Sequence, residues 1–331
     1  MWTLQEEFAR VEIGQASQFR NLTLFPLNRR EAPARARDYL LLDEGIAQGK
    51  VRVTEVAGGG SVPQLSIANT AELPVLLVDG EELVGAKQNR VLNLTILVPA
   101  KHSMVIPVSC VEAGRWRMAS ADLQPVGHMM YSGARAERLS QVTGSMRSSG
   151  SRSSDQGAVW QELAAKAVRL KTTSPTGAMS ALFDHHAIAV EEFVRAFTCQ
   201  DQQCGVAFAI FGRIVGVDLF DSAEVMHKFF QKLVRSYALD ALDAGTDVKG
   251  QASTAELSAF VCDIGAAPSF SDQAVGLGKD VRFTGSEVSG AALWAQERYL
   301  HICAFARESG NAEKSGFWSR IMRPSRRRRN N

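Results

Sequence analysis

The sequence has no long apolar run and few cysteines. No stretch approaches the roughly 18 apolar residues that a membrane-spanning helix needs, and the opening MWTLQEEFARVEIG lacks the basic and apolar segments of a secretory signal. The five cysteines, an odd number at scattered positions, are unlike the dense, even spacing of a disulfide scaffold. These absences argue against a membrane protein and a disulfide-stabilised secreted domain, and they predict a cytoplasmic protein with no membrane contact.

The motifs that would name a cofactor are also incomplete. The pair Cys199 and Cys204 is a single CX4C without a second pair, and the DHH at 184–186 stands alone. The stretch VGLGKD (275–280) lacks the Lys-Ser/Thr ending of a phosphate loop. Cys110 is expected to be a buried thiol and His301 a core histidine. We therefore expect no metal site, and the sequence identifies no cofactor.

The charge of the chain is uneven along its length. The formal net charge is +2, but residues 319–331 hold six Arg and no acid, which leaves 31 basic and 35 acidic residues elsewhere, a charge of −4. A basic nucleic-acid-binding surface is therefore not expected on the folded body. The tail, with Arg326–Arg329 in a row, could make weak contact with nucleic acid or an acidic partner. The alternative is a solvated, disordered tail that aids solubility.

Residues 1–125 are expected to form a β-rich part. Short runs rich in β-branched residues alternate with the turn sequences GGG, DGEE and PAKH, and one helix over 37–49 ends at Gly49. Regular strands at this spacing favour a sandwich or a barrel-like arrangement. The expected strands are 19–27, 50–56, 62–69, 73–79, 91–98 and 103–111.

The rest of the chain divides into three stretches. Residues 126–157 contain much Ser, Gly and Arg and few large apolar groups, which predicts a flexible linker. Residues 158–307 are expected to be an α+β part, and 308–331 a disordered basic tail. The fold class is therefore α+β. The expected elements of the α+β part are helices at 158–170, 174–186, 189–197, 222–242 and 253–265, a hairpin within 205–220 and strands at 280–285, 289–296 and 298–306.

Several local signals support these helices and turns. Gly212 suits the tight turn of the hairpin. Asp221 or Ser222 is expected to cap the helix that follows, and Ser253 with Glu256 forms a capping-box pattern.

A polar segment, GEELVGAKQNRVLN (80–93), lies between the apolar runs PVLLV and LTILV. Gly80 and Gly85 allow the chain to reverse between strands, which would hold the polar side chains in place. In a strand from Ala86 to Val91, alternate residues would face opposite sides. The candidate site residues in this segment are Glu82, Lys87, Gln88, Asn89 and Arg90.

A second polar segment ends the strand in IPVSCVEAGRW (106–116), where Glu112, Arg115 and Trp116 follow apolar residues. An Arg plane beside an indole can hold a flat ligand between them. The alternative is an internal salt bridge from Glu82 or Glu112 to an arginine, which would close the end of a barrel. So many polar groups near strand ends favour a ligand site, because buried polar groups are costly unless they are paired. We expect the two segments to meet in space.

The string LLVDGEELVGAKQNRVLNLTILVPA followed by IPVSCVEAGRW resembles the prokaryotic domain family named for its association with ADP-ribosylglycohydrolases and rhodanese-phosphatases. The resemblance extends to residues 205–242 and to the closing YLHICAF, so it covers most of residues 15–307. It implies, by association alone, a role in ADP-ribose or NAD-linked metabolism. It implies no catalytic residue.

Two functional hypotheses follow. In the first, the chain binds or processes a phosphate-bearing small molecule: Lys87, Arg90 and Arg115 bind phosphate, Glu82 or Glu112 acts as a general base or orients a ribose, and Trp116 stacks on a base. Gln88 and Asn89 complete the ligand-binding set. In the second, the chain is a non-catalytic scaffold in which the polar cluster is a structural lock and the tail recruits nucleic acid or an acidic partner.

Overall fold

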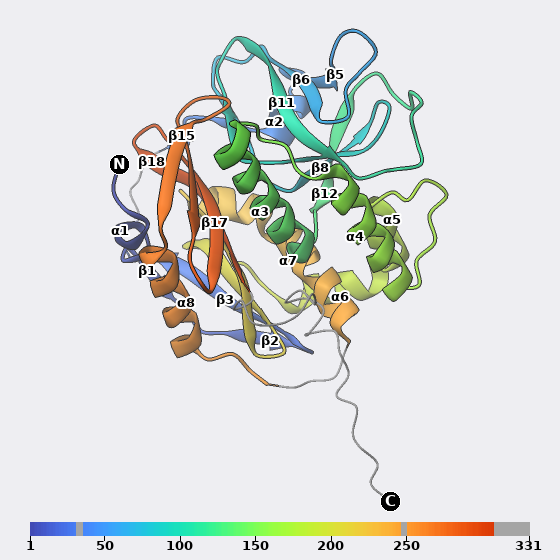
Figure 1. The fold of residues 1–331 in the computed structure, drawn as a ribbon. Helices are drawn as coiled ribbons and strands as arrows, with labels where there is room; N and C mark the ends of the chain where they lie inside the picture. Colours follow the sequence, from blue (N-terminus) through green and yellow to red (C-terminus); the bar gives the residue numbers. More distant parts are fainter. Residues whose placement is uncertain (31–35, 246–249, 308–331) are drawn as a thin grey trace, which may run out of the picture.

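In this computed structural model, which describes residues 1–30, 36–245 and 250–307, helices pack against three β-sheets (Figure 1). The fold is α+β, as the sequence predicts, with curled antiparallel sheets and a half-barrel. Within the described ranges, no helix combines the length and apolar character needed to cross a membrane. The basic tail expected at 308–331 lies outside the described residues.

The largest sheet joins the two ends of the chain. Its strands are β1 Val11–Ile13, β2 Ser17–Phe19, β3 Leu22–Arg29, β13 Gln203–Ile210, β14 Arg213–Phe220, β15 Ser269–Gln273, β16 Lys279–Thr284, β17 Val288–Ala295 and β18 Arg298–Ala306. They lie in the order β1-β3-β13-β14-β18-β17-β16-β15, with β2 also paired to β3. Leu22 is opposite Ile210, so the first 30 residues complete a sheet whose other strands begin after residue 200.

Residues 40–129 form two smaller sheets, and the six-stranded one carries both polar segments. The six-stranded sheet has β5 Val51–Glu55, β6 Gln64–Asn69, β8 Glu81–Gly85, β9 Arg90–Leu92, β11 His102–Cys110 and β12 Leu123–Met129. The three-stranded sheet has β4 Leu40–Leu41, β7 Val75–Leu77 and β10 Ile96–Val98. The strand expected at 91–98 is therefore two strands, because β9 pairs with β11 while β10 pairs with β7.

Helices fill the space between the sheets and cover the large sheet. They are α1 Leu4–Phe8, α2 Leu42–Ala47, α3 Ser132–Ser149, α4 Gln156–Arg169, α5 Ser180–His185, α6 Ala187–Ala196, α7 Ala223–Ala244 and α8 Thr254–Ala266. Helix α7 contacts both β13 and β12, so it lies between the large and the six-stranded sheet. Helices α1 and α8 contact each other, and α8 packs on β14 and β17.

Most of the local signals in the C-terminal half are confirmed. Ser222 caps α7, and Ser253 with Glu256 forms the expected capping box at α8. Gly212 has a φ of +76° in the turn between β13 and β14. The helix expected from Ser174 is wrong at its start: the Ser174 hydroxyl accepts a hydrogen bond from the Ala178 N–H in a turn, and α5 begins later.

The flexible linker predicted at 126–157 is wrong for most of its length. Residues 132–149 form α3, which lies alongside β17 (Figure 1), and β12 occupies part of the preceding stretch. The inner face of α3 carries Arg135, Arg138, Leu139, Val142 and Met146, all buried. These residues recur at helical spacing, which is typical of a buried helix face. Two of them are arginines, which are usually exposed, so the composition indicated a solvated segment.

The two buried arginines of α3 tie the sheets together. Arg135 donates to Asp218 on β14 through both terminal nitrogens, at 2.7 and 3.2 Å, and its Nε lies 3.4 Å from Asp79. Arg138 Nη2 donates to Asp79 at 2.6 Å. Asp79 precedes β8, which starts the first polar segment. The position of that segment against the large sheet therefore depends on these ion pairs.

We expect Arg138→Met to lower the free energy of unfolding by roughly 3–5 kcal/mol, because it leaves a buried carboxylate short of its closest charged partner. Arg147→Met on the same helix is the matched control, since Arg147 is exposed. Urea denaturation of both variants measures the difference. Equal stability of the two variants would show that α3 is held by its apolar contacts alone.

Candidate functional site

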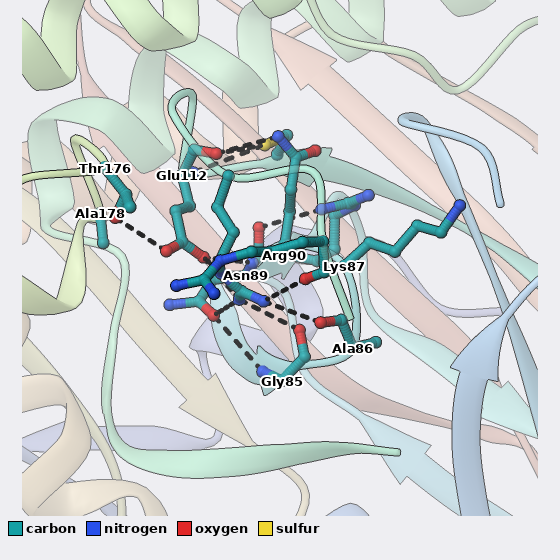
Figure 2. A network of polar contacts seen from close by, with 12 residues as sticks. Gly85, Ala86, Lys87, Asn89, Arg90, Glu112, Thr176 and Ala178 are labelled. Atoms are coloured by element: carbon teal, nitrogen blue, oxygen red, sulfur yellow. Dashed lines mark hydrogen bonds and ion pairs between the residues drawn. The ribbon is translucent and has the colours of Figure 1, made fainter. Parts of the chain in front are cut away.

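The two polar segments meet at one end of the six-stranded sheet (Figure 2), as the sequence analysis expects. Arg115, in the loop after β11, reaches across to the turn between β8 and β9. Its Nη1 donates to the Ala86 carbonyl at 2.7 Å, and its Nη2 donates to Asn89 Oδ1 at 2.9 Å and to the Gly85 carbonyl at 3.2 Å. One guanidinium therefore holds the whole turn.

The backbone of this turn differs from the expected strand at 86–91. Strand β8 ends at Gly85, whose φ is +130°, and Ala86 has a φ of +42°. A Cβ on Gly85 would lie 2.5 Å from the Asp122 carbonyl, so only glycine fits there. Residues 86–89 consequently form a tight turn. The predicted strand from Ala86 to Val91, with Lys87 and Asn89 on the same face, is therefore wrong.

The carboxylate of Glu112 organises the turn from the other side. Its Oε2 accepts hydrogen bonds from the Asn89 N–H at 3.0 Å and from Arg115 Nε at 2.8 Å, and its Oε1 accepts from the Thr176 hydroxyl at 2.8 Å. Burial raises the pKa of Glu112, but the hydrogen bonds from Arg115, Thr176 and Asn89 outweigh burial and hold the pKa below its ordinary value. Both oxygens therefore face protein donors, which favours an orienting role over that of a base.

Arg90 is completely buried, with 0% of its surface exposed. Its Nη1 donates to the Asn89 carbonyl at 3.4 Å, and its Nη2 lies 3.9 Å from Glu55 Oε1. Among the described residues, its Nε has no hydrogen-bond partner. Burial lowers the pKa of Arg90. Because none of its surface is exposed, this guanidinium cannot contact a phosphate bound at the surface.

Glu82 is also buried, and it faces a histidine that the sequence analysis missed. Its Oε2 lies 2.6 Å from His128 Nε2, and its Oε1 lies 3.5 Å from Asn89 Nδ2. The His128 ring stacks on Phe183 with 3.9 Å between ring centroids. Glu82 has no exposed surface, so it cannot itself contact a ligand at the surface. The sequence offered little reason to select His128, because it was a single histidine in a stretch predicted to be a linker. The structure places it in strand β12.

Trp116 and Lys87 form the accessible edge of this network. Trp116 is 48% exposed, and the Lys87 ammonium lies 4.9 Å from the centroid of its indole, within cation–π range. The Arg90 guanidinium lies 5.8 Å from the same centroid. Lys87 is half-buried, and its ammonium also donates to the Gly59 carbonyl. Figure 2 shows Lys87 extending away from the other labelled residues.

The eight predicted site residues thus divide by accessibility, and their functional assignment remains a prediction. Lys87, Arg115 and Trp116 lie at the rim. The buried members, which shape the turn and its supports, are Glu82, Gln88, Asn89, Arg90 and Glu112.

The other chemical candidates have structural partners. Cys110 is buried, and burial raises the pKa of its thiol. His301 is a buried core histidine, hydrogen-bonded to Thr95 at 2.8 Å and Asp218 at 3.2 Å. In the part of the chain that the structure describes, no group of three or more His, Cys, Asp and Glu residues is placed to hold a metal ion.

Comparison with known proteins adds one finding. The model of the ARG and Rhodanese-Phosphatase-superfamily-associated Protein domain matches residues 10–305. The match spans both polar segments, α3 and the whole six-stranded sheet. Neither a curated protein nor a solved structure matches the chain.

We expect Arg115→Lys to destabilise the fold by roughly 2–4 kcal/mol. One ammonium cannot replace a forked donor that bonds to Glu112, to Asn89 and to three backbone carbonyls. Arg117→Lys, at an exposed position of the same loop, is the matched control. Thermal and urea unfolding measure the effect. A decrease in the free energy of unfolding of less than about 1 kcal/mol would mean that other contacts hold the turn without Arg115.

Proposed function

Because the chain belongs to the ARG and Rhodanese-Phosphatase-superfamily-associated Protein domain family, we propose that it binds a flat, phosphate-bearing small molecule on the surface of Trp116. ADP-ribose and NAD-derived compounds are the ligands that the family's name suggests. One observation carries the proposal: the half-exposed indole of Trp116 has an ammonium 4.9 Å from its centroid, and the neighbouring Arg115 bonds the loop of Trp116 to the β8–β9 turn.

The chemistry of this edge suits a nucleotide. A base can stack on the indole, which is worth about 1–3 kcal/mol per base, while a phosphate can bond to Lys87 and to the exposed Arg117. The bonds from Arg115 hold the loop before the ligand arrives. Binding therefore requires little ordering of the protein, which limits its entropic cost.

Processing of the ligand requires a group that moves a proton. In this network the best-placed group is His128, because the Glu82 carboxylate lies 2.6 Å from its Nε2 and orients its ring. Glu82 would then position His128 and not act as the base itself.

A recognition module for another macromolecule is the second candidate. It is favoured by the run Trp116, Arg117 and Met118, which is exposed on a rigidly held loop; Met118 is 58% exposed. Trp, Arg and Met are enriched at protein interfaces.

We also propose a cytoplasmic location, where the five free cysteines would stay reduced.

We expect Trp116→Ala to weaken ADP-ribose or NAD binding by about 5- to 150-fold, the range that follows from lost stacking. Met118→Ala is the matched control on the same loop and should bind as the wild type does. Isothermal titration calorimetry measures the affinities, and a melting curve confirms that both variants fold. Equal binding by the two variants would contradict the site, and failure of every nucleotide to bind would favour the recognition module.

We expect deletion of residues 319–331 to abolish binding to double-stranded DNA or RNA at low salt, because it removes six arginines. Neutralising six phosphates implies a fall in DNA affinity of roughly 1000-fold between 50 and 200 mM salt. Fluorescence anisotropy with a labelled duplex, on the full chain and the truncated chain, measures both effects. Unchanged binding after truncation would eliminate the role of the tail.

A further inference from the structure

The glycine loop between β5 and β6, residues Gly58, Gly59 and Gly60, lies against the accessible edge of the site. All three glycines have a positive φ, at +86°, +109° and +89°. A Cβ on Gly60 would lie 3.0 Å from Glu55 Oε2 and 3.5 Å from Lys87 Cδ. On Gly58 and Gly59, a Cβ would have no heavy atom within 4 Å. The inner end of the loop therefore contacts the site, and its tip has free space around it.

A single hydrogen bond ties the glycine loop to the site. The Lys87 ammonium donates to the Gly59 carbonyl, and within the described residues no other hydrogen bond joins this loop to another segment. Glycines have no side chains to hold the loop, and they adopt conformations that are closed to other residues. A segment with so few contacts can change conformation at small cost once Lys87 releases it.

The basic residues at this edge are only partly neutralised. Lys87 forms no ion pair in the part of the chain that the structure describes, and the only ion pair of Arg90 there is with Glu55, at 3.9 Å, beyond hydrogen-bond distance. Arg115 and Glu112 form a closed pair of their own at 2.6 Å. Two cations, Lys87 and Arg90, therefore share one carboxylate, which leaves a net positive charge.

An anion beside Lys87 would balance this charge next to the stacking surface. The ammonium lies 4.9 Å from the centroid of the Trp116 indole, so a phosphate bound to it lies close to a base stacked on that ring. Lysine binds phosphate as a point charge, and successive backbone N–H groups in a turn form a concave anion site. The N–H groups of Gly58 and Gly59 donate to no other described residue, so they are free for such a role.

We propose that the glycine loop is a lid that binds the phosphate of a nucleotide stacked on Trp116. Lys87 transfers its hydrogen bond from the Gly59 carbonyl to a phosphate oxygen, and the released loop turns its N–H groups toward the same phosphate. One lysine thus couples ligand binding to loop closure. This inference rests on the proposed function, because it takes Trp116 as the stacking surface.

Calorimetry on the full chain with ADP-ribose and inorganic pyrophosphate tests the lid. Gly59→Asp places a carboxylate in the loop, where it pairs with Lys87 and repels phosphate, and Asp tolerates a positive φ better than most residues. We expect it to weaken both compounds by about 10- to 100-fold, comparable to the loss of a charged hydrogen bond. Gly49→Asp is the matched control, because Gly49 also has a positive φ, +66°, and free space for a Cβ, but it follows α2.

Amide spectra of the full chain labelled with ¹⁵N-glycine follow the loop directly. Pyrophosphate should shift the signals that are missing from the spectra of Gly58→Ala and Gly59→Ala. Wild-type affinity in Gly59→Asp, or loop signals that do not move, would overturn the proposal.

Trp116→Ala separates this inference from the proposed function. It should weaken ADP-ribose more than pyrophosphate, because only ADP-ribose has a base to stack. Loss of ADP-ribose binding in Trp116→Ala but not in Gly59→Asp would support stacking and overturn the lid. Loss in Gly59→Asp but not in Trp116→Ala would support the phosphate-binding loop and contradict stacking, and absence of binding by both compounds would overturn both.

Discussion

The ion pairs of Arg135 and Arg138 are the constraint on which the rest of the structure depends. Both guanidiniums are completely buried, and both reach Asp79, while Arg135 also reaches Asp218 on the large sheet. Burial of charge costs several kcal/mol per ion unless partners and geometry compensate for it. Such a cluster therefore tolerates few alternative arrangements, and it fixes the polar hairpin against the large sheet.

The turn between β8 and β9 shows how that rigidity reaches the surface. On the inner side of the turn, Glu112 and Arg115 form hydrogen bonds to its backbone. On the solvent side, Trp116 remains half exposed. The buried residues Asn89, Arg90 and Glu112 hold the turn in place, whereas the contacts proposed for a ligand lie at its exposed edge.

The sequence predicted what local chemistry determines. Glycine with a positive φ at Gly212 and the caps at Ser222 and Ser253 were identified correctly because each depends on a few neighbouring residues. Helix α3 was not identified, because burial of its arginines requires aspartates about 60 and 80 residues away. His128 became a candidate only when the structure placed it beside Glu82.

The pairing of β3 with β13 has a consequence for the order in which the protein is made. On the ribosome, the strand at 22–29 emerges long before its partner at 203–210, and at 5–20 residues per second the delay is roughly 10–35 s. During that interval a strand with the apolar residues Leu22, Leu24, Phe25 and Leu27 has no native neighbour at this edge. All the strands of the six-stranded sheet are made by residue 129, so that sheet has its partners long before the large sheet does.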